Sequence, residues 1–396
     1  MTQTKGAERP LAGIRVIELA RVLAGPWAGQ MLADLGADVI KIEHPDGGDE
    51  TRGWGPPFIT GADGKPLSAA YFHAANRGKR SVAVDFKTDE GRAVIRRLAA
   101  TADVVIENFK VGGLARYGLD HASLAAINPR LVTCSITGFG QTGPYRDRPG
   151  YDFIIQGMAG FMSVTGAPDG QPMKAGVAIA DVFTGIYAVS AIEAALIRAL
   201  KTGKGCHIDM ALMDVMLAAM ANQNMNFLAT GDAPRPLGNA HPNIAPYQVI
   251  ETEDGHIIIA VGNDGQFARI CALLGLEALP ADPRFATNAA RVENRATLTD
   301  LLVEKTRQWQ RDDLVAACET ANVPTGPINS IADAFTDPQI IARAMRVELT
   351  DASGNAIPSV RMPVMLDGIA ACADRPSPGL GEHTGDVLAE LGADNG

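Results

Sequence analysis

The chain has 396 residues, of which 46% are hydrophobic and 20% charged, a balance typical of globular proteins and long enough for two domains. Its formal net charge is -10 and it has no strong run of lysine and arginine, which argues against nucleic acid as a partner. Its five cysteines lack metal-ligand spacing, and its first ten residues lack an apolar signal region. No uninterrupted apolar stretch is long enough to span a bilayer. These features predict a soluble, cytoplasmic protein without a metal site or a membrane partner.

The N-terminal part of the chain alternates short β-branched runs with helical segments. Residues 14–19 and 37–43 predict two strands joined by a helix over 27–35, with Pro26 in its first turn and Gly36 at its end. The alternation continues with strands expected at 81–85, 103–107 and 131–136, and a helix at 87–98. Because β-α-β units require parallel strands, this pattern predicts an α/β domain with a Rossmann-like parallel sheet.

The composition changes in the second half of the chain. A methionine-rich helix expected over 212–228 is followed by a linker rich in proline and glycine. Residues 247–261 predict a hairpin with Asp254 and Gly255 at its turn, and helical segments follow. The expected organisation is a large domain whose N-terminal part is 1–225, a smaller α+β domain with its linkers over 226–325, and a return to the large domain over 326–396.

Asp181 is the most informative single residue, because apolar segments precede and follow it. Carboxylates are seldom fully buried unless they are paired. One interpretation is that Asp181 is the N-cap of a helix that continues to about Lys201. The other is that a helix start presents the carboxylate to a cleft as a nucleophile. The two interpretations are compatible, since backbone N–H groups at a helix start also bind negative charge.

Other chemistries have weaker support in the sequence. Glu43 ends the second strand, where an acidic residue could hold a ribose, but the preceding turn lacks the Gly-x-Gly-x-x-Gly pattern of dinucleotide-binding proteins. Neither a Gly-x-Ser-x-Gly elbow nor a His-x-x-x-His pair is present. Basic residues are spread among the predicted loops, namely Arg21, Arg52, Arg80, Lys87 and Arg116. The residues alone therefore indicate an enzyme of small acidic or phosphorylated ligands.

A set of short strings, in the right order, resembles the class III CoA-transferases. They are VLAGP at 22–26, GADVIKIE at 36–43, KRS at 79–81, ENF at 107–109, RPGYD at 148–152, VAIAD at 177–181 and LGEHT at 380–384. The family includes formyl-CoA transferase and carnitine CoA-transferase, with the 2-methylacyl-CoA racemases as a sister branch. The resemblance implies an interlocked homodimer and a ping-pong mechanism through an aspartyl anhydride and an aspartyl-CoA thioester. CoA is then a substrate and not a permanent cofactor.

The resemblance also implies roles for individual residues. It places the nucleophile on Asp181, whereas a type I turn explains the nearby Asp169. Contacts to CoA map onto Val22, Leu23, Ala24, Val84, Lys87, Asn108 and Arg116. Further substrate contacts are expected from Arg21, Arg52, Tyr151, Asp152, Gly238 and His241. Leu23 stands where formyl-CoA transferase has an active-site glutamine, and the glycine-rich lid of that enzyme is reduced here to 238–242.

The expected substrates also follow from the resemblance. Segments 241–247 and 260–267 look most like the dicarboxylate branch, which implies succinyl-CoA as donor and a short dicarboxylic acid as acceptor. Arg21 and Arg52 are candidates for holding the non-reacting carboxylate, unless they bind CoA phosphates or Glu43 instead. The alternative is a racemase, but Tyr151 stands where that branch has histidine, and tyrosine is a poor proton shuttle at neutral pH. A non-catalytic CoA-binding protein is a more distant alternative.

Overall fold

The computed structural model describes residues 9–393, which form two compact units. Within the described residues, unit 1 comprises 9–161, 174–229 and 338–393, and unit 2 comprises Met162–Met173 and Thr230–Asp337. The chain therefore leaves unit 1, builds most of unit 2, and returns to unit 1 for its C-terminal part.

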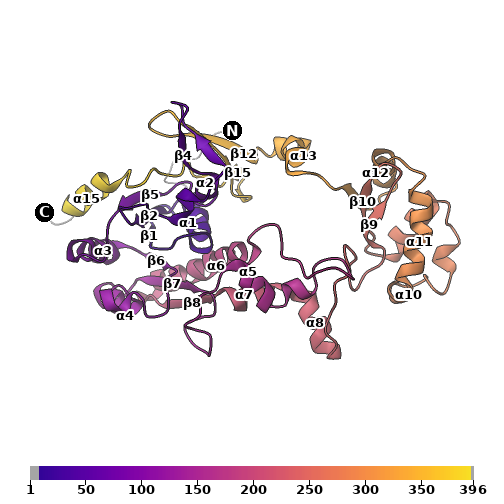
Figure 1. Ribbon diagram of the computed structural model, residues 1–396, viewed down its shortest axis with the longest axis horizontal. Helices are drawn as coiled ribbons and strands as arrows, with labels where there is room; N and C mark the ends of the chain where they lie inside the picture. Colours follow the sequence, from indigo (N-terminus) through magenta and orange to yellow (C-terminus); the bar gives the residue numbers. More distant parts are fainter. Residues whose placement is uncertain (1–8, 394–396) are drawn as a thin grey trace. The chain divides into compact units, whose positions relative to one another are not determined.

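A six-stranded parallel sheet forms the centre of unit 1 (Figure 1). Its strands are β1 (Arg15–Glu18), β2 (Asp38–Glu43), β5 (Arg80–Ala83), β6 (Val104–Glu107), β7 (Val132–Thr137) and β8 (His207–Ala211). The spatial order is β5-β2-β1-β6-β7-β8, so the chain first adds strands on one side of β1 and then on the other. The sheet thus has a topological switch point between β1 and β6, where open α/β sheets bind ligands at the carboxyl ends of their strands. This confirms the predicted α/β fold.

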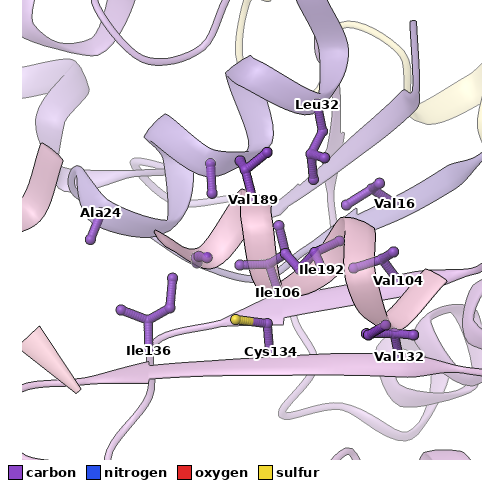
Figure 2. Packing of buried hydrophobic residues seen from close by; sticks show 14 of the residues in the cluster. Val16, Ala24, Leu32, Val104, Ile106, Val132, Cys134, Ile136, Val189 and Ile192 are labelled. Carbon is purple, nitrogen blue, oxygen red and sulfur yellow. The ribbon is translucent and has the colours of Figure 1, made fainter. Parts of the chain in front are cut away.

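Helices cover both faces of this sheet. One face packs on α1 (Ala24–Asp34) and α6 (Ile179–Thr202), and Figure 2 shows side chains of these helices against Val16, Val104 and Ile106 of the strands. The other face packs on α3 (Asp89–Thr101), α4 (His121–Ile127) and α15 (Thr384–Ala393). Neighbouring strand residues point to opposite faces, and both sets are buried. Because both faces of each strand are buried, neighbouring strand residues are both apolar, which explains the short β-branched runs in the sequence.

Shorter elements complete unit 1. Its remaining helices are α2 (Ala70–His73), α5 (Asp152–Met158), α7 (Leu212–Ala219), α8 (Ala221–Thr230) and α14 (Pro338–Ala342). Antiparallel pairs are formed by β3 (Phe58–Thr60) with β4 (Pro66–Ala69), β12 (Arg346–Thr350) with β13 (Ala356–Val360), and β14 (Met365–Leu366) with β15 (Ile369–Ala370).

Two helices differ from the sequence-based expectation. The helix predicted over 212–228 is divided into α7 and α8 at Ala221, whose φ is +43°. The side chain of Asn224 donates a hydrogen bond of 2.6 Å to the carbonyl of Leu217, which satisfies a backbone group at the end of α7. The second helix, α6, begins at Ile179, so Asp181 is its third residue and not its N-cap.

Helix α6 is also the one described helix that is long and apolar enough to cross a membrane by composition. Its apolar sequence is interrupted by Asp181, Glu193, Arg198 and Lys201, so it is not the uninterrupted apolar stretch whose absence the sequence analysis noted. Its face formed by Ala180, Thr184, Ala188 and Ile192 is fully buried against α1 and the sheet. This burial is typical of the core helix of a globular domain, which passes the same test of length and composition.

Unit 2 is a separate α+β body. Its sheet consists of β9 (Tyr247–Glu251), β10 (His256–Ala260) and β11 (Thr325–Pro327), all antiparallel. Its helices are α9 (Asp264–Leu273), α10 (Asn288–Glu293), α11 (Arg295–Thr306), α12 (Arg311–Thr320) and α13 (Ile331–Thr336). The predicted hairpin is present, and the amide of Thr252 donates to the carbonyl of Gly255 across its turn at 2.9 Å. Ile250, Ile257 and Phe267 belong to a core of its own.

Candidate active site

A pocket of about 700 Å³ opens at the carboxyl ends of the central strands and lies entirely within unit 1. Its walls come from the turn after β1, the loops after β6 and β7, and the first residues of α5 and α6. This is the switch point of the sheet, so the fold brings together residues that are far apart in the sequence.

Asp181 lies in this pocket in the first turn of α6. Its side chain has neither a hydrogen-bond partner nor an ion-pair partner within the described residues 9–393. Burial, and then the charge of Asp152, raise the pKa of the Asp181 carboxyl to about 7. A partly buried, unpaired carboxylate at a helix start and in a cleft is the kind of group that functional sites contain. The interpretation of Asp181 as an N-cap does not explain this position, because its carboxylate accepts no hydrogen bond from a backbone amide of α6.

Asp152, the first residue of α5, holds the backbone beside Asp181. Its Oδ1 accepts a hydrogen bond of 2.8 Å from the amide of Ala180, and its Oδ2 accepts one of 2.8 Å from Nε2 of Gln156. The fully buried Gln156 also accepts a 2.8 Å hydrogen bond from the amide of Ala175, which fixes the segment leading into α6. Asp152 therefore caps α6 from a neighbouring helix, and α6 has no side-chain cap of its own.

The turn after β1 forms another wall and has an unusual backbone. Val22 has a φ of +73°, which for a β-branched residue costs about 1–3 kcal/mol. Asn108 clamps the preceding residue, since its Oδ1 accepts from the amide of Arg21 at 3.0 Å and its Nδ2 donates to the carbonyl of Arg21 at 2.7 Å. Leu23 and Ala24 start α1, which has neither a side-chain cap nor an acid in its first turn. The helix dipole there favours an anionic ligand.

Positive charge is concentrated around the pocket although the chain is acidic overall. The basic side chains that line it are Arg21, Lys87, Lys110, Arg116, Arg146 and Arg148. The acidic ones are Glu50, Asp147, Asp152 and Asp181. Phe86 contacts Phe109 and Tyr117 edge-on, with ring centroids 5.5 and 5.3 Å apart, and the guanidinium of Arg116 lies 4.7 Å from the centroid of Tyr117. Cations beside aromatic faces suit a ligand with phosphates and a flat ring.

Many residues predicted to contact substrate come together in this pocket. Of those expected to contact CoA, the pocket includes Val22, Leu23, Ala24, Lys87, Asn108 and Arg116. Of the further substrate contacts, it includes Arg21, Tyr151 and Asp152. Val84 is buried in the core that packs on α3 and does not line the pocket. Gly238 and His241 belong to unit 2, where the rings of His241 and Tyr247 have centroids 5.3 Å apart.

Arg52 has a structural role that replaces the predicted one. Its Nε and Nη2 donate to the two oxygens of the buried Glu43 at 2.8 and 2.6 Å, and its Nη1 donates to the carbonyl of Pro378 at 3.1 Å. Its guanidinium also lies 3.7 Å from the centroid of the Phe72 ring. Because these contacts occupy the guanidinium and Arg52 does not line the pocket, the prediction that it holds a substrate carboxylate is not supported, and the alternative of a contact with Glu43 is observed.

Several residues near the site carried no clear signal in the sequence. Burial, followed by the charges of Asp181, Asp152 and Asp49, raises the pKa of Tyr71 to about 12, so this phenol lies within electrostatic range of Asp181. Nothing in the local pattern around Tyr71 or Gln156 distinguishes either residue. Arg148, which lines the pocket, could have been found because it begins the RPGYD string.

Comparisons with known proteins agree with this geometry. The family model described as CoA-transferase family III matches residues 11–384. The chain is similar to a succinate–glutarate CoA-transferase of Agrobacterium fabrum, with 62% identity over 391 residues that cover 99% of this chain and 98% of the relative. It is also similar to the human succinyl-CoA:glutarate CoA-transferase, with 39% identity over 383 residues, 97% of this chain and 86% of the relative.

A solved structure gives the same result for the fold. The crystal structure of a CAIB/BAIF family protein from Brucella suis matches with a TM-score of 0.85 and 59% sequence identity, and the match covers 96% of this chain and 99% of that chain. Sequence and structure are thus similar over nearly the full length of the described chain. The chain belongs to CoA-transferase family III and is an enzyme of that class.

Proposed function

We propose that this enzyme transfers CoA from succinyl-CoA to a short dicarboxylic acid, with glutarate as the preferred acceptor and Asp181 as the nucleophile. The observation that supports this most is the unpaired carboxylate of Asp181 in a pocket rich in cations. The substrate names of the relatives from Agrobacterium fabrum and human point to the same pair of acids.

Transfer begins when a carboxylate oxygen of Asp181 attacks the thioester carbonyl carbon of succinyl-CoA. The carbon–sulfur bond breaks, the CoA thiolate leaves, and a mixed anhydride of Asp181 and succinate remains. The thiolate then attacks the aspartyl carbonyl, which releases succinate and leaves an aspartyl-CoA thioester. No proton has to move in these steps, because Asp181 reacts as a carboxylate and CoA leaves as a thiolate.

The second half of the reaction repeats these steps with the acceptor. A carboxylate oxygen of glutarate attacks the aspartyl thioester, so that CoA leaves again and an aspartyl–glutaryl anhydride forms. The thiolate attacks the glutaryl carbonyl, which gives glutaryl-CoA and restores the carboxylate of Asp181. Partial burial supports this chemistry, since a carboxylate with little hydration and no hydrogen bond needs little desolvation before attack. Each anhydride needs protection from water and a positioned thiolate.

The residues around Asp181 have separable proposed roles. Lys87 and Arg116 hold phosphate groups of CoA, and the amides at the start of α1, at Leu23 and Ala24, contact its anionic or polar parts. Arg21 is our candidate for the non-reacting carboxylate of the acceptor. Its present partner is the exposed Glu50, and exposed ion pairs contribute little, so a substrate carboxylate can replace Glu50.

We further propose that the enzyme works as a homodimer in the cytoplasm. Large apolar side chains of α5, α6 and α8 are exposed on unit 1, among them Phe153, Ile154, Ile186, Tyr187 and Leu228. Contiguous exposed apolar residues are typical of protein interfaces. The five cysteines, at described positions, are all unpaired, which suits a reducing compartment.

The nucleophile is tested by trapping. The enzyme is incubated with succinyl-CoA, treated with hydroxylamine or borohydride, digested and analysed by mass spectrometry. The modified peptide should contain Asp181, and Asp181→Ala should abolish both trapping and glutaryl-CoA formation. A label on Asp152 or Asp169 would show that another carboxylate is the nucleophile. Racemase activity would instead show as deuterium wash-in at the α-carbon of a 2-methylacyl-CoA without CoA transfer.

A further inference from the structure

The backbone of Val22 requires an external restraint. Its φ of +73° lies in the left-handed region, where glycine is relaxed and a β-branched residue is strained. Such a conformation persists only where surrounding groups hold it. Val22 lines the pocket together with Leu23 and Ala24, so its backbone angle sets the direction of that wall.

Asp49 supplies a direct restraint. The amide of Val22 donates to both carboxylate oxygens of Asp49, at 3.3 Å each. Asp49 itself is only 1% exposed and does not line the pocket. It lies in the loop after β2, whereas the clamp of Asn108 on Arg21 comes from the loop after β6. These two strands flank β1, so the turn after β1 is held from both neighbours.

The carboxylate of Asp49 is in turn fixed by a buried network. Nζ of Lys41 lies 2.9 Å from it, and Thr51 donates its amide at 3.0 Å and its hydroxyl at 2.8 Å. Lys41 also contacts Glu18 at 3.1 Å, and these two side chains are fully buried. Burial alone would raise the pKa of Asp49, but Lys41 and Thr51 outweigh it and hold the pKa below its ordinary value. The carboxylate of Asp49 that restrains Val22 is therefore ionised and held in a fixed position.

We propose that Asp49 is a positioning residue for the acyl-CoA, which acts by holding Val22 in its left-handed conformation so that the start of α1 faces the pocket. Leu23 and Ala24 both line the pocket, and their amides have no hydrogen-bond partner within the described chain, which leaves these amides available to a ligand. Without Asp49, Val22 relaxes toward negative φ and turns this wall away. The inference rests on the proposed function, because it assumes that acyl-CoA binds in this pocket.

The test compares Asp49→Asn with Glu18→Gln by calorimetric titration with coenzyme A and by steady-state kinetics with succinyl-CoA and glutarate. Both substitutions remove a buried charge next to Lys41, so both should lower the melting temperature. Only Asp49→Asn touches the amide of Val22. This amide lies 3.3 Å from both carboxylate oxygens of Asp49, so asparagine replaces one of its two acceptors with an NH2 group that faces it donor to donor. It should raise the Kd for coenzyme A and the KM for succinyl-CoA about tenfold or more, with a smaller change in kcat, while Glu18→Gln leaves both binding constants within about threefold.

Glycine at position 22 separates positioning from general stability. In a Val22→Gly background the left-handed conformation needs no restraint, so adding Asp49→Asn should change the Kd by less than about threefold. In the protein that keeps Val22, Asp49→Asn should raise the Kd for coenzyme A by the full factor of about ten or more. If Asp49→Asn does not fold, Thr51→Val replaces it, since this variant removes one hydrogen bond that fixes Asp49 and should raise the Kd by about two- to fivefold in the Val22 background only.

Three results would overturn the proposal. The first is an unchanged Kd for coenzyme A in Asp49→Asn or Thr51→Val. The second is a Kd that rises as much in Glu18→Gln as in Asp49→Asn. The third is a Kd that Asp49→Asn raises as much in the Val22→Gly background as in the protein with Val22. Failure of the proposed function is seen separately, because the unaltered enzyme would then neither bind coenzyme A nor form glutaryl-CoA. An unaltered enzyme that binds coenzyme A tightly while all variants bind equally well contradicts the role of Asp49 alone.

Discussion

Asp152 accepts a 2.8 Å hydrogen bond from the amide of Ala180 and so anchors the residue immediately before Asp181. The same carboxylate, after burial, raises the pKa of Asp181. One side chain therefore fixes the direction of the proposed nucleophile and also tunes its charge. These two effects make separate predictions, since one depends on a hydrogen-bond acceptor and the other on a negative charge.

The first prediction is that transfer depends on pH through Asp181. Only the carboxylate attacks, and burial with Asp152 places its pKa at about 7. The value of kcat/KM should rise about tenfold per pH unit below pH 7 and level off above it. The measurement is a pH profile of kcat/KM for succinyl-CoA between pH 5 and 9. Asp169→Asn, which removes an exposed carboxylate in a turn, should give the same profile. A profile that is flat across pH 6–8 would contradict a raised pKa.

The second prediction concerns stability. The pKa of Asp181 is raised from 3.8 to about 7, so between these values the folded state holds a proton that the unfolded state has lost. The stability that this proton contributes is complete below pH 4 and disappears as the pH rises through 7. Asp181→Asn carries no charge at any pH, so at pH 8 it should be more stable than the unaltered protein, by roughly 2–4 kcal/mol.

Urea unfolding at two pH values measures this effect. At pH 8 the asparagine variant should have the higher midpoint, and near pH 4 the two proteins should unfold at nearly the same concentration. Lower stability of Asp181→Asn at pH 8 would mean that the carboxylate has a stabilising partner. The enzyme would then have to hold Asp181 in an ion pair with a cation that lines the pocket.

The third prediction separates the two roles of Asp152. Asp152→Asn keeps an oxygen that can accept from the amide of Ala180 but loses the negative charge, so the pKa of Asp181 should fall and the midpoint of the pH profile should move to lower pH. Asp152→Ala also removes the cap and should lower kcat further at every pH. Asp147→Asn is the control, because Asp147 lines the same pocket without raising the pKa of Asp181. A midpoint that stays in place in Asp152→Asn refutes the electrostatic role.

The fourth prediction assigns the acceptor carboxylate to Arg21. The unaltered enzyme should prefer glutarate to butyrate, an acid without the second carboxylate, by about 100-fold or more in kcat/KM. In Arg21→Gln this ratio should fall toward one, because the cation that distinguishes the acids is lost. The measurement is kcat/KM for both acids at a fixed concentration of succinyl-CoA.

Arg52→Gln is the matched control for Arg21. It leaves the carboxylate of Glu43 buried and unpaired, so it should destabilise the fold by about 3–5 kcal/mol. The ratio of glutarate to butyrate should nevertheless stay as in the unaltered enzyme. If the ratio collapses in Arg52→Gln and persists in Arg21→Gln, the acceptor site is at Arg52 and its contact with Glu43 must open during turnover.

The sheet was predictable because its signal is local. Each central strand is buried on both faces, so Val16 and Ile17 are both apolar and a short β-branched run reports the strand directly. The hairpin around Gly255 was predictable for a similar reason, since its turn residues are adjacent in the sequence.

The capping of α6 could not be predicted in this way. Its cap comes from Asp152, which is 28 residues away from Ala180 along the chain, and no local pattern reports such a contact. The role of Arg52 could not be predicted for a different reason. A guanidinium pairs equally well with the carboxylate of Glu43 and with that of a substrate, so the sequence does not show which one it binds. The resemblance to a family indicated which residues gather in the pocket, but the three-dimensional packing decides which of them are already occupied.

The return of the chain to unit 1 has a consequence for how the protein is made. Arg80 on β5 pairs with Glu390 on α15, which is 310 residues later, and Val387 and Leu391 complete the core on that face of the sheet. During synthesis, the ribosome must therefore add all of unit 2 before this face can close. Until then α3 and α4 cover only part of this face, and the apolar patch on which α15 later packs stays uncovered while the ribosome adds about 5–20 residues per second. Late-stage chaperone dependence, and aggregation of chains truncated before α15, are the expected result.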